Sequence, residues 1–205
     1  MHKEILTSNQ VELLPLVRKF FREYYLVGGT AIGLHLGHRR SIDFDLFKFA
    51  TVNVKRILSK ISEFQYSYQI TRHVSDQLNI NIKDVKFTFF EYPFQVQVKE
   101  TFENTIRLPG LLDLAAMKAY ALGRRSKWKD YVDLYFIIKY HFSITQISSR
   151  ANEIFDQLFS EKLFRAQLSY FSDIDDSEPV EYLNSPVDDQ EIKAFLVDKA
   201  VEFGF

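Results

Sequence analysis

Two aspartates separated by a single residue are the first feature of this sequence that could do chemistry. They are Asp43 and Asp45, in a stretch where apolar and acidic residues alternate. Read as a strand, this stretch places both carboxylates on one face and Ile42, Phe44 and Leu46 on the other. Like charges this close repel each other unless water or a cation screens them. Mg²⁺ would relieve the repulsion, because it binds one or two carboxylates together with substrate phosphates and water.

A pair of glycines, Gly28 and Gly29, lies shortly before the aspartates and follows the apolar stretch 24–27, which is typical of a buried strand. Glycines at such a point let the backbone bend sharply and approach a ligand closely. Thr30 is expected to cap a short helix over residues 31–36. The free N–H groups and positive end of that helix would suit a phosphate.

Each of these features also has a simpler interpretation. A Gly-Gly pair alone is usually a turn, and an Asp-x-Asp pair alone is usually a solvated strand face. Their order within a short stretch is far more specific: strand, Gly-Gly, helix, strand, Asp-x-Asp. This order resembles the signature of the nucleotidyltransferase superfamily that includes DNA polymerase β and the aminoglycoside nucleotidyltransferases.

The sequence around these residues is similar to that of one branch of the superfamily, the AbiEii/AbiGii toxin type. Residues 28–31 read GGTA and residues 38–47 read HRRSIDFDLF, which resembles the branch's GGTALAL…HR.S.D.D.F. Residues 115–135 contain AAMK, an arginine and KDYVDLY, which resembles its AMK…R…KD..DLY block. The resemblance covers residues 25–140 in ordered blocks.

The resemblance implies transfer of a nucleoside monophosphate from an NTP to a hydroxyl group, with pyrophosphate as the leaving group. Positioning and charge neutralisation supply most of such catalysis. The resemblance implies that Asp43 and Asp45 hold Mg²⁺, in a site for one or two ions, and that Lys118 offsets triphosphate charge. The candidate site residues are Asp43, Asp45, Lys118 and Asp130 as catalytic and Gly28, Gly29, Thr30, Arg39, Arg40, Arg125 and Lys129 as nucleotide-binding.

Several of these residues have a structural alternative. Lys118 could be a solvated lysine on an amphipathic helix, and Asp130 could be the N-cap of its helix. Asp133 lies among apolar residues and could hydrogen-bond a helix end or pair with an arginine inside the fold. The basic cluster within residues 124–129 could contact nucleic-acid phosphate or form a solvated surface. For Arg40, the alternative role is simply to balance the negative charge of the aspartates.

One departure from the family pattern concerns a third carboxylate, which usually serves as metal ligand and general base. In this branch it falls in a strand with the pattern vkvDf..yp, and the corresponding stretch here places Thr88 at the Asp position. Threonine cannot accept a proton at neutral pH, so Glu91, Asp84 or Asp130 replaces the carboxylate, or activity is reduced or absent. Glu91 is three residues from Thr88, which puts it on the opposite face of a regular strand unless a bulge intervenes.

The elements that must position these residues form an α/β half and a helical half. Strands are expected at 66–73, 78–82, 85–92 and 94–99, with a turn at 83–84, and helices at 10–24, 54–61, 111–122, 130–140, 147–159, 163–170 and 191–203. We predict an α/β (α+β) fold. A nucleotidyltransferase-like mixed β-sheet flanked by helices forms domain 1–109, and a C-terminal helical domain spans 110–205.

Composition narrows the classes of function. The 205 residues carry a net charge of −1, so no global field draws the chain to nucleic acid or membrane. The absence of cysteine excludes disulfides and thiolate chemistry and is compatible with a reducing cytosol. No signal peptide or membrane span is evident, so we expect a cytoplasmic protein without membrane contact. The family resemblance implies that it is prokaryotic.

The leading hypothesis is a Mg²⁺-dependent nucleotidyltransferase of the AbiEii toxin type, the toxin of a toxin–antitoxin pair. Its expected partners are an NTP, an RNA acceptor such as tRNA, and a cognate antitoxin. The alternative is a degenerate module that binds a nucleotide or a protein partner without turnover, which Thr88 favours. A third hypothesis is nucleotidylation of a small molecule such as an antibiotic.

Overall fold

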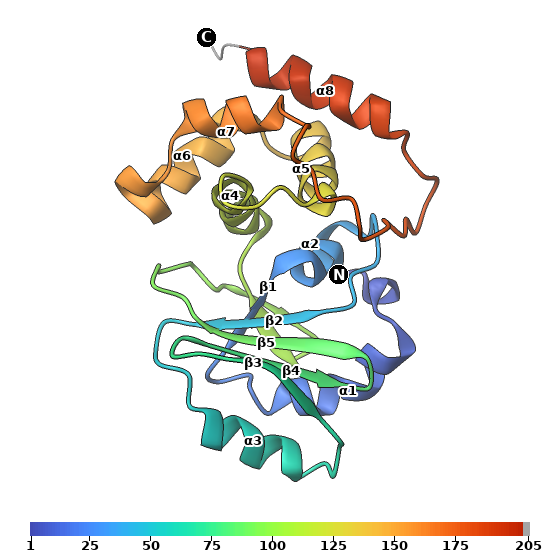
Figure 1. Ribbon diagram of the computed structural model, residues 1–205, viewed down its shortest axis with the longest axis vertical. Coiled ribbons are helices and arrows are strands. Elements are labelled where there is room, and N and C mark those ends of the chain that lie inside the picture. The colour runs from blue at the N-terminus through green and yellow to red at the C-terminus, as the bar shows by residue number, and fades with distance from the viewer. Residues whose placement is uncertain (203–205) are drawn as a thin grey trace. The chain divides into compact units, whose positions relative to one another are not determined.

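The computed structural model describes residues 1–202 and divides the chain into two compact units, Met1–Gly110 and Leu111–Phe205. The strands belong to the first unit, and the described part of the second unit is built of helices (Figure 1). The division lies next to Pro109. The assignment of residues 1–109 and 110–205 as separate domains stays a prediction.

The first unit is built on a mixed seven-stranded sheet, which confirms the predicted fold class. Its elements are η1 (Lys3–Ile5), α1 (Ser8–Arg18), β1 (Tyr25–Val27), α2 (Gly28–Leu36), β2 (Phe44–Lys48), α3 (Val54–Ser62), β3 (Gln69–His73), β4 (Gln77–Ile82), β5 (Val85–Glu91), β6 (Glu100–Phe102) and β7 (Ile106–Leu108). The strand order is β3-β4-β5-β2-β1-β7-β6. The pairs β2–β5 and β1–β7 are parallel, and the other pairs are antiparallel.

One face of the sheet is apolar and carries the core of the first unit. Phe44, Leu46 and Phe87 on this face are buried, as alternation along β2 and β5 requires. Helices α1 and α3 lie on this side of the sheet, whereas α2 lies on the other (Figure 1). The rings of Phe20, just after α1, and Phe89 are 4.9 Å apart in an edge-on arrangement. This packing fixes β2 and β5 as a rigid base for side chains on the opposite face.

The second unit consists of α4 (Leu111–Leu122), α5 (Trp128–Tyr140), α6 (Ile144–Phe155), η2 (Asp156–Leu158), α7 (Glu161–Leu168) and α8 (Asp189–Val201). Side-chain caps mark several helix starts. Ser143 and Gln146 form a capping box at α6, and Asp188 caps α8. The connection before α8 contacts the start of α5, where the backbone N–H of Trp128 donates to the carbonyl of Asp175 over 3.0 Å.

Three sequence-based expectations for the elements were wrong. Residues 94–99 alternate like a strand but form no strand of the sheet, because this segment connects β5 to β6 at the far edge of the sheet. The first long helix ends at Arg18 instead of residue 24. The strand expected from Ser41 begins at Phe44, so Ile42 is 51% exposed instead of lying with the core.

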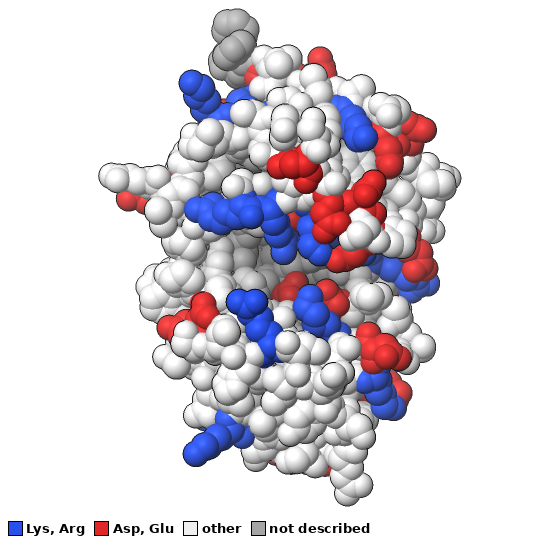
Figure 2. Space-filling model, viewed as in Figure 1, with Lys and Arg blue, Asp and Glu red and all other residues white. Residues whose placement is uncertain are grey.

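Charge is mixed on the surface. On the face shown in Figure 2, cationic and anionic side chains lie side by side on both units, in keeping with the net charge of −1. Among the helices formed by residues 1–202, none combines the length and the apolar character that a membrane span requires.

Candidate functional site

The turn between β1 and α2 brings a carboxylate against a helix start. Gly28 has a φ of +71° and is the first residue of α2, so Val27, and not Thr30, is the N-cap. Val27 pairs with Asp45 across the β1–β2 ladder. A Cβ atom added to Gly28 would lie 2.2 Å from Oδ2 of Asp45. Only glycine therefore allows the Asp45 carboxylate and the first N–H groups of α2 to share this space.

Thr30 ties α2 to the loop that carries the first aspartate. Its side chain is 1% exposed, and its hydroxyl donates to the backbone carbonyls of Asp43 and Ser41, the latter over 3.4 Å. This geometry gives Thr30 a positioning role that the sequence did not indicate. Its predicted contact with phosphate stays a prediction.

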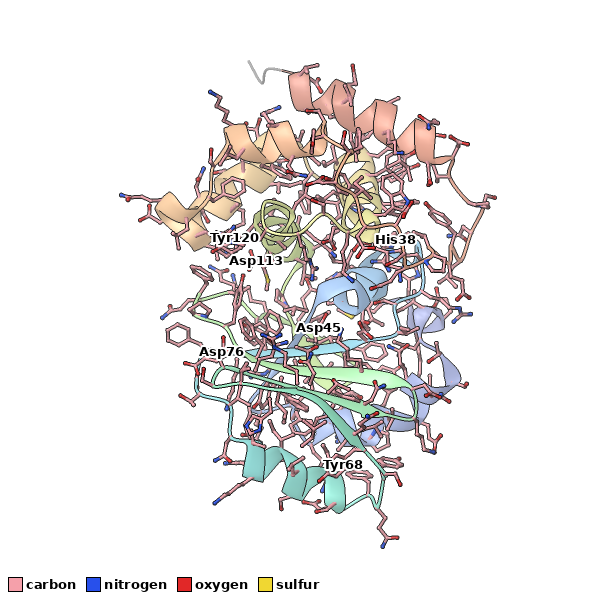
Figure 3. All side chains as sticks on the ribbon, in the orientation of Figure 1. His38, Asp45, Tyr68, Asp76, Asp113 and Tyr120 are labelled. Carbon is pink, nitrogen blue, oxygen red and sulfur yellow. The ribbon has the colours of Figure 1, made fainter. Side chains whose placement is uncertain are left out.

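The two aspartates reach the same side of the sheet from different backbone contexts. Asp45 lies within β2, on the side that carries α2 (Figure 3), whereas Asp43 precedes the strand. Lys86 on β5 places its Nζ 3.3 Å from Oδ2 of Asp43. Sequence reasoning missed Lys86, although it lies two residues before Thr88 and so had to share its face. This lysine offsets part of the repulsion between the carboxylates.

Thr88 occupies the position opposite Asp45 in the parallel β2–β5 ladder and is 7% exposed. Glu91 lies opposite Lys48 further along the same strand pair, and the register between them is unbroken. Glu91 therefore lies on the other face of the sheet. Asp84 lies in the β4–β5 turn, with a φ of +60°. Within Met1–Gly110, neither Glu91 nor Asp84 reaches the position that the missing carboxylate would occupy.

The donor set fits a hard divalent cation completed by its substrate. Within residues 1–202, no group of three or more His, Asp or Glu side chains could hold a metal ion. Asp43 and Asp45 supply the two carboxylates that Mg²⁺ commonly takes from protein, and phosphate oxygens and water would supply the rest.

Two arginines predicted to bind nucleotide support the chain around the glycine turn. Arg39 is 2% exposed, and its Nη1 donates to the carbonyl of Arg40 over 2.9 Å. Its Nη2 lies 2.9 Å from the point that a Cβ on Gly29 would occupy. Arg40 donates to the carbonyls of Glu4 and Leu6, each over 3.2 Å. Nucleotide contact by either arginine stays a prediction.

In the second unit, Lys118, Arg125, Asp130 and Asp133 form one ion-pair cluster. Lys118 Nζ pairs with Oδ1 of Asp130 and with Oδ2 of Asp133, the latter at 3.0 Å. Arg125 Nε lies 2.9 Å from Oδ2 of Asp130. Lys118 is 5% exposed, so it is not a solvated lysine, and α5 begins at Trp128, so Asp130 is not its N-cap. Asp133 is paired inside the fold, with Lys118 as a partner.

Lys129 lies outside this cluster. Its Nζ donates to Oε2 of Glu178 over 3.1 Å, and Lys127 donates to Oε1 of the same carboxylate over 2.5 Å. The hydrogen bond from Lys127, helped by Lys129, outweighs partial burial and lowers the pKa of Glu178 to about 2. The structure therefore assigns Lys129 a contact with the connection before α8, and its predicted contact with nucleotide stays a prediction.

Solved structures share this fold at low sequence identity. A proposed nucleotidyltransferase from H. pylori superposes with a TM-score of 0.59 over 94% of this chain and 92% of that chain, at 19% identity. MenT4, a nucleotidyltransferase toxin of Mycobacterium tuberculosis H37Rv, superposes with a TM-score of 0.60 over 93% of this chain and 81% of that chain, at 13% identity. Identities this low show the fold alone.

Sequence comparison identifies the family. An uncharacterized protein of Aquifex aeolicus (strain VF5) is 35% identical over 126 residues, which are 58% of this chain and 59% of that protein. The chain thus matches less than two thirds of that relative's length. The family model of the nucleotidyl transferase AbiEii toxin, Type IV toxin–antitoxin system, matches residues 16–200. The chain belongs to the AbiEii nucleotidyl transferase toxin family.

Proposed function

We propose that this chain transfers a nucleoside monophosphate from an NTP to a hydroxyl group on RNA, with tRNA as the preferred acceptor. The observation that carries the proposal is the Asp45 carboxylate lying against Gly28 at the start of α2. A carboxylate and a helix N-terminus in one space suit a cation and a phosphate bound together. Membership of a toxin family supports a role as the toxin of a toxin–antitoxin pair, with the cognate antitoxin as partner.

The proposed roles follow from the chemistry of each group. Asp43 and Asp45 would hold Mg²⁺, which when bound neutralises triphosphate charge and polarises phosphoryl oxygens. The backbone N–H groups at Gly28 and Gly29 would bind phosphate oxygens, because these donors at a helix start have no intrahelical partner.

Residues of the second unit have proposed roles by family resemblance. Lys118 and Arg125 would contribute positive charge toward the triphosphate, with Lys129 as a further contact. Asp130 is the proposed replacement for the missing general base, because Glu91 and Asp84 point elsewhere. To act so, Asp130 must exchange part of its present pairing with Lys118 for contact with substrate.

The test is incubation of the purified chain with total RNA, Mg²⁺ and each α-³²P-labelled NTP in turn. Asp45→Asn removes one charge from the proposed metal site, and Asp76→Asn, in the exposed turn between β3 and β4, is the matched control. We expect one NTP to label RNA with wild type and Asp76→Asn, and the label to be lost with Asp45→Asn. Label that persists in Asp45→Asn would overturn the proposed site.

Thr88 supports a second candidate function, that of a module that binds nucleotide or protein without turnover. Its hydroxyl stands where a carboxylate is expected, directly opposite Asp45. This candidate predicts Mg²⁺-dependent NTP binding by calorimetry with no labelled RNA and no release of pyrophosphate. Pyrophosphate release that depends on RNA would exclude it.

A further inference from the structure

A second row of side chains lies beside the row that contains Asp45, on the same face of the sheet. Strand registers place Asp45, Thr88 and Asn79 side by side across β2, β5 and β4. Two residues along the same strands, the registers place Phe47, Phe90 and Gln77 side by side. Because alternate residues share a face, both rows face the same side of the sheet.

The second row presents aromatic surface next to the carboxylates. The rings of Phe47 and Phe90 are 5.1 Å apart in an edge-on arrangement, and both side chains remain partly exposed. Other phenylalanines of these strands, Phe44, Phe87 and Phe89, are buried in the core on the opposite face. Phe47 and Phe90 also pack on the buried ring of Tyr92, with centroids 5.2 and 6.2 Å away, and the faces that stay exposed are where a planar ligand could stack.

Amide groups continue both rows on β4. Gln77 Nε2 donates to Oδ1 of Asn79 over 2.8 Å. This bond orients the two amides. The other atom of each amide, Oε1 of Gln77 and Nδ2 of Asn79, has no hydrogen-bond partner within residues 1–202. An acceptor and a donor beside an aromatic surface match the polar edge of a nucleobase.

The position of the two rows indicates that they would bind the acceptor and not the NTP. Phosphates at the start of α2 would lie on the β1 side of β2, whereas β5 and β4 lie on its other side. Attacking and leaving oxygens take opposite sides of the phosphoryl group in an in-line transfer. The attacking hydroxyl would thus come from the side of Thr88. The two rows are about 7 Å apart at the rise of a strand, a separation that one nucleoside can span.

We infer that Phe47 and Phe90 form a stacking surface for the terminal base of a single-stranded RNA acceptor, and that Gln77 and Asn79 hydrogen-bond its edge. The inference rests on the proposed function, because it takes the acceptor to be RNA. It extends that function by placing the terminal nucleoside with its hydroxyl near Asp45 and its base over Phe90.

The test measures binding in the absence of NTP, so that it does not depend on turnover. Two fluorescently labelled RNA oligonucleotides are compared by anisotropy, identical except that one ends in an abasic residue. We expect wild type to bind the oligonucleotide with the terminal base about 5–100-fold more tightly, the range that stacking of one base supplies. Phe90→Ala should abolish this preference, and Phe90→Trp should keep it.

Phe49→Ala is the matched control, because Phe49 follows β2 and is 59% exposed outside both rows. It should leave the preference unchanged. Gln77→Ala should weaken binding of the oligonucleotide with the base and leave binding of the abasic one unchanged. Circular dichroism establishes that each variant is folded before its binding is compared.

Equal binding of the two oligonucleotides by wild type would overturn the inference, as would a preference that survives Phe90→Ala. Failure of the proposed function is a separate result. Labelled RNA in the transfer assay together with equal binding would overturn the stacking surface alone. A base preference without any transfer would keep the stacking surface and overturn the transferase.

Discussion

At the scale of single residues, Thr88 offers the sharpest test of the chemistry. Thr88→Asp would place a third carboxylate opposite Asp45 in the β2–β5 ladder. Without metal, the added negative charge should lower stability by about 1–2 kcal/mol, because a carboxylate beside other carboxylates is unfavourable. With Mg²⁺ the loss should be recovered, and transfer should rise by about 100-fold if a general base is what the site lacks.

Thr88→Asn is the control, since it has nearly the shape of aspartate without the charge. Thermal unfolding of both variants with and without Mg²⁺ gives the comparison. A Mg²⁺-dependent recovery in Thr88→Asp alone supports a metal site at Asp43 and Asp45. The same response in both variants would argue against that site.

Lys118 is predicted to be essential for folding as well as for its proposed role with substrate. Lys118→Met would leave Asp130 and Asp133 with one cation fewer in a buried cluster. Removing one partner of a buried ion pair lowers the free energy of unfolding by about 3–5 kcal/mol, because an uncompensated charge remains. Lys129→Met, at a more exposed pair with Glu178, should cost less than about 1 kcal/mol. Urea unfolding measures both, and equal effects would contradict the burial argument.

At the scale of elements, the β1–α2 turn depends on the absence of a side chain at Gly28. Gly28→Ala would force a residue with Cβ to keep a φ of +71° and to displace the Asp45 carboxylate. The left-handed conformation alone costs about 1–2 kcal/mol. Gly123→Ala is the control, because its Cβ would meet nothing closer than a carbonyl at 3.9 Å. Calorimetric unfolding should show a loss for Gly28→Ala only.

The connection before α8 should detach from α5 as the pH falls. Glu178 has its pKa lowered to about 2 from the usual 4.5, chiefly by the hydrogen bond from Lys127. A depressed carboxyl pKa stabilises the fold fully above pH 4.5, and this contribution disappears as the pH falls toward 2. Glu178 is 51% exposed, so the effect should stay below about 1 kcal/mol.

Glu178→Gln should therefore lower the melting temperature at pH 6, and its difference from wild type should shrink steadily toward pH 3. Asp176→Asn, on an exposed residue of the same connection, is the control and should show no such trend. A difference that does not vary with pH would mean that the ion pairs with Lys127 and Lys129 do not hold the connection.

At the scale of the whole molecule, local sequence patterns predicted where helices and strands occur better than they predicted which of these elements lie next to each other. The two-residue turn at Lys83 and Asp84 fixes the β4–β5 register, so Asn79 opposite Thr88 could have been found by counting. The parallel register of β2 and β5 brings Thr88 to Asp45, but no turn connects these strands, so only the family resemblance, which placed Thr88 at the position of a third metal ligand, indicated that the two residues are neighbours. The crossover at residues 94–99 has the alternation of a strand, which misled the assignment.

The pairing of Lys118 with two aspartates also could not be predicted from the sequence. Helical spacing places Asp130 and Asp133 on one face of α5, but only the packing of α4 brings a lysine between them. Resemblance to the family had marked Lys118, Arg125 and Asp130 as a set. Their contact in the structure gives that set a physical basis, whichever role each has with substrate.

The division into two units leads to a prediction for the chain as a whole. Fragments 1–110 and 111–205 should each unfold cooperatively, because each unit has its own buried apolar residues, such as Phe87 in the first and Leu134 in the second. Neither fragment should transfer nucleotide alone, since the proposed metal ligands belong to the first and Lys118 and Asp130 to the second. Circular dichroism melts and the RNA-labelling assay check both parts. Transfer by fragment 1–110 alone would show that Lys118 and Asp130 are structural, and the catalytic site would then be confined to the sheet.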